Sequence, residues 1–154
     1  MGALANVLGL LTVQIGIVNV HFSQLPVIFS GLSLGPVPGA AVGALGFLVS
    51  SFMLPAANPY VIGGNAILGF FTGLFYVKVR RIRRRPIVPQ IVAVVLAYLV
   101  QAPYVFLTDV YLMAMPVPIV LAIMAVLLVE DLTCVFFCHA ILYRVDMRML
   151  LSTR

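Results

Sequence analysis

The chain has 154 residues, of which 64% are hydrophobic and 8% are charged, and its mean hydropathy is +1.21. Soluble domains carry about 25% charged residues, so this composition excludes an ordinary soluble domain. The formal net charge of +5 comes largely from one short basic segment, which suits membrane topology better than binding of nucleic acid.

The segment from Met1 to Val77 contains no Asp, Glu, Lys or Arg. Because a bilayer core of roughly 30 Å is crossed by about 20 helical residues, this segment has room for three or four crossings. Lipid permits only helices or a closed barrel. Barrel strands alternate apolar and polar residues, whereas runs such as Ile91–Ala97 are apolar throughout. We therefore predict an all-α integral membrane protein of the cell membrane, with residues 1–154 forming a single transmembrane domain.

Polar or Pro- and Gly-rich breaks interrupt the apolar sequence, since Pro and Gly favour turns and end helices. The breaks predict a bundle of six transmembrane helices at approximately 2–19, 23–34, 37–53, 61–77, 87–108 and 119–146. The second apolar run is short: Pro26–Leu34 covers only about 14 Å as a helix. If it does not cross, three helices precede the basic segment and the N-terminus lies outside.

The basic segment Lys78–Arg85 sets the predicted orientation. Short loops rich in Lys and Arg stay in the cytoplasm, and the C-terminal tail also carries Arg. With four helices before this segment and two after it, both termini are cytoplasmic.

The last apolar segment contains two acidic residues, Glu130 and Asp131. Extended to Arg148, this segment is about 45 Å long as a helix, which is long for one crossing, so we expect a break near residue 128. The carboxylates would then lie at the outer end of the last helix, next to the positive end of its dipole. In an unbroken helix they would lie near the middle of the membrane, where a functional role is the default interpretation.

Three breaks face outward in this topology, at 21–24, 54–60 and 109–118, and they carry most of the groups able to recognise a ligand. Polar residues within the apolar segments, including Gln14, Gln101 and Asp131, are further candidates. Interfacial, turn or interhelical roles remain the alternatives for each. The predicted substrate-binding residues are Asn19, His21, Asn58, Tyr60, Asn65, Tyr104, Asp109 and Glu130.

Motifs for catalysis are absent from the sequence: there is no P-loop, no Gly-x-Ser-x-Gly and no His-Glu-x-x-His. We expect no enzyme activity and no cofactor. Cys134 and Cys138 lack the partners of a zinc site, so we predict no metal. The pair Ala5-x-x-x-Gly9 has the small-residue spacing that lets membrane helices approach closely, either within the chain or against a partner.

The stretch Gln24–Gly46 reads QLPVIFSGLSLGPVPGAAVGALG. With the loop ending in Asn58-Pro59-Tyr60 and the Gly-rich segment after it, this stretch resembles the substrate-binding S-components of energy-coupling factor (ECF) transporters. The resemblance covers roughly residues 20–77, and the second half agrees in layout. Two departures are present: Ala5-x-x-x-Gly9 stands where many members have Ala-x-x-x-Ala, and Phe47 follows Gly46 where an acidic residue often comes soon after.

The resemblance implies six helices, an N-terminus inside, and capture of a vitamin, vitamin precursor or similar small nutrient at the outer face. It also implies a transmembrane coupling subunit and two ATP-binding subunits as partners, docked through the first helix at Ala5 and Gly9. The alternatives are a stand-alone small transporter or channel, for which Glu130 and Asp131 would line the path, and a membrane scaffold protein. Carboxylates near the pocket favour a neutral or cationic ligand, and the substrate itself is not specified by the sequence.

Overall fold

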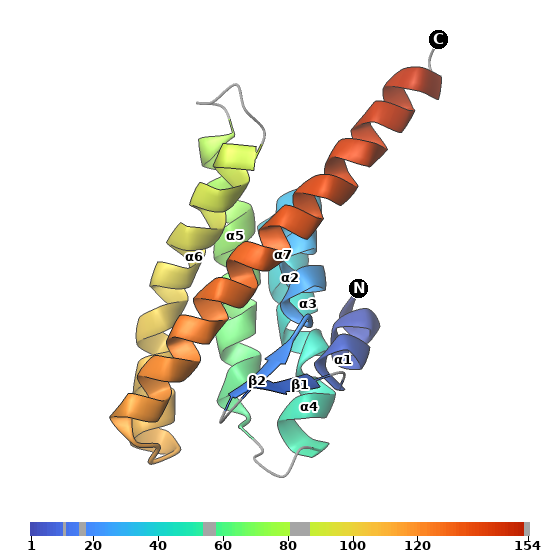
Figure 1. The fold of residues 1–154 in the computed structure, drawn as a ribbon. Coiled ribbons are helices and arrows are strands. Elements are labelled where there is room, and N and C mark those ends of the chain that lie inside the picture. Colours follow the sequence, from blue (N-terminus) through green and yellow to red (C-terminus); the bar gives the residue numbers. More distant parts are fainter. Residues whose placement is uncertain (11, 16–17, 54–57, 81–86, 153–154) are drawn as a thin grey trace.

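The computed structural model describes residues 1–10, 12–15, 18–53, 58–80 and 87–152, and within these ranges it leaves out the side chains of 10–21, 50, 53 and 145–152. The elements in chain order are α1 (Gly2–Leu10), β1 (Thr12–Ile15), β2 (Val18–His21), α2 (Gln24–Leu34), α3 (Pro36–Gly46), α4 (Leu48–Met53), α5 (Tyr60–Val79), α6 (Ile87–Leu107), the π-helix η1 (Thr108–Leu112) and α7 (Val117–Ser152). The fold is thus a helical bundle with one short hairpin (Figure 1).

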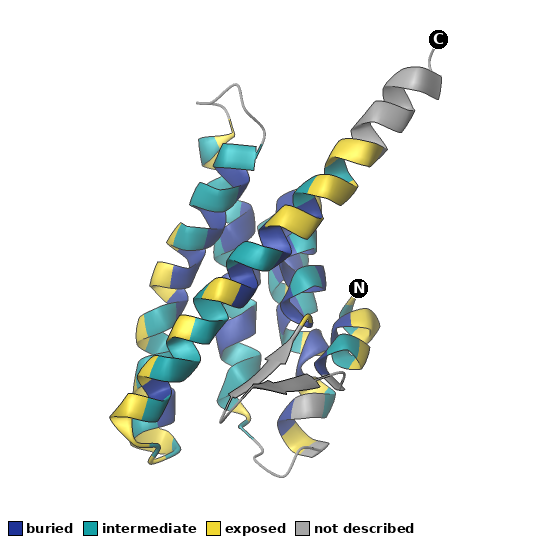
Figure 2. Cartoon of the chain, in the orientation of Figure 1, coloured by how far each residue is buried: buried dark blue, intermediate teal, exposed yellow. Residues whose placement is uncertain are grey.

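Three helical segments are long and apolar enough to cross a membrane: Tyr60–Val79, Ile87–Leu112 and Val117–Arg144. α2 and α3 are apolar but have only 11 residues each. The predicted helices 23–34, 61–77 and 87–108 correspond to α2, α5 and α6, with ends within two residues of those predicted. Many large apolar side chains on the outside of the bundle are exposed, as expected for helices that contact lipid (Figure 2).

The predicted helix at 2–19 is wrong in its second half. α1 ends at Leu10, and β1 and β2 pair as an antiparallel hairpin with Thr12 opposite His21 and Ile15 opposite Val18. The strands are rich in Val, Ile and Thr, whose branched Cβ atoms favour extended backbone. An unbroken apolar run concealed this local preference.

Two further predictions about helix ends need correction. The predicted helix 37–53 is interrupted at Phe47, where α3 ends and α4 begins. The break predicted near residue 128 is wrong, because α7 runs unbroken over 36 residues, about 54 Å at 1.5 Å per residue. Pro118 lies in its first turn, where a missing N–H removes no intrahelical bond. Glu130 and Asp131 therefore lie in the middle of the apolar part of α7.

Glycines bring α3 and α5 into backbone contact. A Cβ on Gly39 would collide with the carbonyl oxygen of Gly69, and a Cβ on Gly43 with that of Asn65. At the start of α3, a Cβ on Gly73 would lie 2.5 Å from the nitrogen of Pro36. Only glycine permits such a close approach, so these positions fix how the two helices cross.

The core lies where α2, α5, α6 and α7 meet. Its members are buried residues from all four helices: Ile28, Leu32, Leu68, Val94, Ala97, Cys134, Val135 and Cys138. Figure 1 shows the end of α5, the start of α6 and the C-terminal end of α7 at one end of the bundle. The start of α5, η1 and the start of α7 lie at the opposite end, and this arrangement positions the site described below.

The glycine contact predicts a stability difference between two substitutions on α5. Gly69→Ala places its methyl group against the backbone of Gly39, whereas Gly64→Ala meets its nearest neighbour at 3.6 Å, an ordinary contact. We expect Gly69→Ala to lower the free energy of unfolding by about 1–3 kcal/mol and Gly64→Ala to have little effect. Thermal unfolding in detergent can be followed with a thiol-reactive dye, because Cys134 and Cys138 are fully buried in the fold. Equal unfolding temperatures for the two variants would contradict the backbone contact.

Candidate functional site

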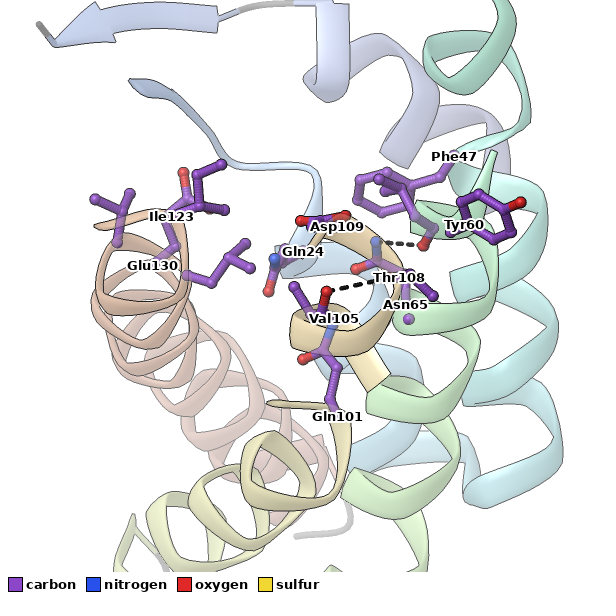
Figure 3. Close-up of a pocket in the computed structure, with 14 residues that line it drawn as sticks. Gln24, Phe47, Tyr60, Asn65, Gln101, Val105, Thr108, Asp109, Ile123 and Glu130 are labelled. Carbon is purple, nitrogen blue, oxygen red and sulfur yellow. Dashed lines mark hydrogen bonds between the residues drawn. The ribbon is translucent and has the colours of Figure 1, made fainter. Parts of the chain in front are cut away.

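A cavity of about 250 Å³ lies between α2, the start of α5, the end of α6 with η1, and the middle of α7. Figure 3 shows its polar side chains approaching from several helices. Its lining combines amides, carboxylates and aliphatic side chains: Gln24, Phe47, Tyr60, Val61, Gly64, Asn65, Gln101, Val105, Thr108, Asp109, Ile123, Val126, Leu127 and Glu130. This mixture of an apolar wall and a few convergent polar groups is typical of small-molecule sites.

Three amide side chains in the lining have buried polar atoms without a hydrogen-bond partner among the described residues. They are both polar atoms of Gln24, Oε1 of Gln101 and Oδ1 of Asn65. The side chains are almost completely buried, with 1%, 2% and 4% of their surface exposed. Because a buried polar group without a partner costs about 1–3 kcal/mol, native structures rarely leave one unpaired. Three such groups around one cavity indicate that something else pairs with them.

Asn58 joins the start of α5 to η1 at the rim of the cavity. Its amide nitrogen donates to Oδ1 of Asp109 at 2.9 Å, and its Oδ1 accepts from the backbone N–H of Tyr60 at 3.1 Å. The π-helical turn at Thr108–Leu112 places Thr108 and Asp109 in the cavity wall, and such turns are frequent at functional sites. The side chain of Asn58 therefore links the start of α5 to η1 in the cavity wall.

Tyr104 supports this wall from behind. Its hydroxyl donates to the carbonyl oxygen of Tyr60 at 3.2 Å, and its ring end occupies the space where a side chain on Gly63 would lie. The hydroxyl of Thr108 lies 3.0 Å from the carbonyl oxygen of Tyr104 and 3.1 Å from that of Val105. Its hydrogen is therefore used within α6, and its lone pairs remain for a ligand.

The carboxylate of Glu130 lines the cavity from α7, with the aliphatic side chain of Leu127 one turn earlier. Asp131 is the next residue and is fully buried, and neither of its carboxyl oxygens has a partner among the described residues. Two turns before Asp131, the Tyr98 hydroxyl donates to the carbonyl oxygen of Met124 at 2.8 Å and joins α6 to α7. The two acidic residues are thus structurally distinct: Glu130 faces the cavity and Asp131 the packed interior.

The structure brings together half of the predicted substrate-binding residues. Tyr60, Asn65, Asp109 and Glu130 line the cavity. Asn58 contacts Asp109 at its rim, and Tyr104 lies behind the wall instead of in it. The side chains of Asn19 and His21 lie outside the described residues.

Sequence reasoning left Gln24 and Gln101 out of the predicted binding residues. In the sequence, Gln24 is one residue of a polar break, and Gln101 is one polar residue in an apolar segment. Burying a glutamine in an apolar membrane segment costs free energy unless it has a hydrogen-bond partner. Gln101 was therefore the stronger candidate of the two for a binding residue. The position of Gln24 could not be inferred, because it depends on where α2 begins.

Ala5 and Gly9, the predicted docking residues, are both buried. A Cβ on Gly46 of α3 would lie 2.5 Å from the Cβ of Ala5, so Ala5 packs against α3 within the chain. This contact fits the alternative of packing within the chain, and docking of a partner at Ala5 and Gly9 stays a prediction. Among the described residues there is no group of three or more His, Cys, Asp or Glu side chains arranged to hold a metal ion.

The sequence matches the family model described as "ECF transporter, substrate-specific component" over residues 1–145. The chain belongs to this family. It is therefore a substrate-specific component of a membrane transporter and not an enzyme. Among solved structures, the chain is similar to the S component of a bacterial ECF transporter, with a TM-score of 0.72 and 21% sequence identity. The similarity covers 97% of this chain and 92% of that one, which supports the same fold. No protein among the curated sequences matches.

The Asn58 contacts predict that this residue stabilises the wall of the cavity. Asn58→Ala removes the acceptor for the Tyr60 N–H and a hydrogen bond to a carboxylate, so we expect the free energy of unfolding to fall by about 2 kcal/mol. Asn58→Asp keeps an acceptor for the Tyr60 N–H but places a second carboxylate beside Asp109, and it should also destabilise, most strongly at neutral pH. Thermal unfolding of both variants checks this, and unfolding of Asn58→Ala at the wild-type temperature would contradict it.

Proposed function

We propose that this chain captures a small nutrient, such as a vitamin or vitamin precursor, at the outer face of the cell membrane and delivers it through a shared energising module. The module comprises a transmembrane coupling subunit and two ATP-binding subunits, as the family implies. The observation that carries the proposal is the cavity lined by three buried amides with unpaired atoms. A bound ligand would supply the missing hydrogen bonds.

The distribution of charge supports an outward-facing cavity. Lys78 and Arg80 lie at the end of α5, whereas Tyr60 at the start of α5 lines the cavity (Figure 1). Since basic residues next to membrane helices stay in the cytoplasm, the end of the bundle that carries Tyr60 and Asp109 faces outward. We further propose a multi-pass protein with six crossings and both termini in the cytoplasm, in which the short helices α2 and α3 pack against α5 and α1 packs against α3.

The unbroken α7 gives one observation in favour of a second function. Glu130 and Asp131 lie at mid-length of its apolar part, where a stand-alone transporter or channel would place ion-binding groups. Copurification distinguishes the two functions. An ATPase pair retained with the tagged chain supports the S-component function, whereas transport by the chain alone in liposomes supports the second. A chain that retains no ATPase subunits and transports nothing by itself would contradict both and would suit a membrane scaffold.

Two glutamines of α6 provide a matched test of the cavity. Both are buried, with 2% of their surface exposed, but Gln90 pairs with Nδ1 of His139 at 3.1 Å while Oε1 of Gln101 has no partner among the described residues. Gln101→Leu should leave the free energy of unfolding of the ligand-free chain unchanged or higher, because an unpaired buried group is removed. It should weaken substrate binding at least tenfold, since about 1.4 kcal/mol is the value of one good hydrogen bond.

Gln90→Leu is the control, because its effects should be the reverse. It lies outside the cavity lining, and it should reduce stability by about 1 kcal/mol through loss of the bond to His139 while substrate uptake persists. Uptake by cells with the complete transporter and thermal unfolding of each purified chain are the two measurements. If Gln101→Leu destabilises the chain and leaves uptake intact, Gln101 has a structural role and the proposed binding site is wrong.

A further inference from the structure

The hydrogen-bonding groups of the cavity are dominated by acceptors. Asp109 and Glu130 contribute carboxylates, and neither Lys nor Arg nor His is among the described residues of the lining. A carboxylate that is ionised can only accept hydrogen bonds. The charge that the described lining residues can carry is thus negative only.

Two further side chains of the lining are fixed as acceptors by their own bonds. The amide nitrogen of Asn65 donates to the carbonyl oxygen of Val61 at 2.9 Å, which sets the orientation of the amide and leaves its buried Oδ1 unpaired. Thr108 uses its hydroxyl hydrogen within α6, as described above. Gln24 and Gln101 can rotate their amides and present either an oxygen or an NH₂ group, so they adapt to the ligand.

Helix N-termini usually favour anions, and both α2 and α5 begin at the cavity. Here their first donors are already used. The N–H of Tyr60 pairs with Asn58 Oδ1, that of Ile62 with the carbonyl oxygen of Pro59, and that of Leu25 with the carbonyl oxygen of Phe22. Asp109, held by Asn58, also places a carboxylate next to the start of α5. An anionic ligand would therefore find few free donors and two carboxylates.

We infer that the cavity binds a small nitrogen-rich cation, such as an amidinium, an aminoheterocyclic cation or a primary ammonium, and excludes carboxylates and phosphates of the same size. N–H groups of the ligand donate to Asn65 Oδ1 and to the carboxylates of Asp109 and Glu130. The aliphatic side chains of Ile123 and Leu127 contact its apolar part. This inference rests on the proposed function, because it specifies the ligand of the same site.

Benzamidine, benzamide and benzoate form a suitable probe series. They share one size and shape, but the first is a cation with only donors, the second is neutral with both, and the third is an anion with only acceptors. Each is added at millimolar concentrations to the purified full chain at pH 7, and the dissociation constant follows from the rise in unfolding temperature. We expect benzamidine to bind at least tenfold more tightly than benzoate, with benzamide between them.

Variants that remove one charge but keep the shape of the side chain show which carboxylates cause the preference for benzamidine over benzoate. Asp109→Asn and Glu130→Gln should each reduce the preference for benzamidine over benzoate to less than threefold. Tyr111→Phe and Val129→Ala are the matched controls, since these neighbouring side chains are 72% and 64% exposed and lie outside the lining. The controls should keep the wild-type preference.

The inference is overturned if benzoate binds as tightly as benzamidine, if none of the three compounds raises the unfolding temperature, or if neither neutral variant changes the preference. Copurification of the ATPase pair and nutrient uptake are measured in parallel. If both are present while benzoate binds best, the ligand class is wrong and the proposed function stands. If both are absent, the proposed function fails whichever compound binds.

Discussion

The backbone contact between α3 and α5 determines where every other helix can lie. Gly39 and Gly43 of α3 pack directly on the backbone of α5 at Gly69 and Asn65, with no side chain between them. Such contacts hold membrane helices together, because lipid tails give no hydrophobic driving force for association of apolar surfaces. The same contact fixes Asn65, whose side chain lines the cavity, so the helix packing and the binding site depend on the same residues.

Burial of the unpaired polar groups of the cavity lowers the free energy of unfolding, and packing alone does not offset this loss. Gln24 and Gln101 are almost completely buried, so their unpaired amide atoms have little access to bulk water. Gln24 and Gln101 have buried polar atoms without partners among the described residues, and under the proposed function a ligand pairs with them. The part of the wall that carries Asp109 is, in contrast, fully supported by Asn58. The site thus combines a preformed side at α5 and η1 with adaptable amides on α2 and α6.

The sequence was most informative where one strong physical constraint acts. The apolar runs around residues 61–77 and 87–108 have the length of a bilayer crossing, and α5 and α6 follow them closely. It was least informative where weak preferences compete. The hairpin after Leu10 follows a local β preference within a largely apolar stretch, and α7 continues through Glu130 although two adjacent carboxylates favoured a break there. Asp109 and Tyr60 could be predicted as binding residues because they are polar residues in breaks. The place of Gln24 in the cavity could be seen only in the folded structure.

An experimental density map of the chain, purified from its own cells, tests the central claim most directly. The account predicts one small molecule in the cavity, with donor atoms within hydrogen-bond distance of Asn65 Oδ1 and of the Gln101 side chain. A cavity filled by a lipid tail would contradict the account. So would a collapsed cavity in which Gln24 and Gln101 pair with each other, because the unpaired amides would then need no ligand.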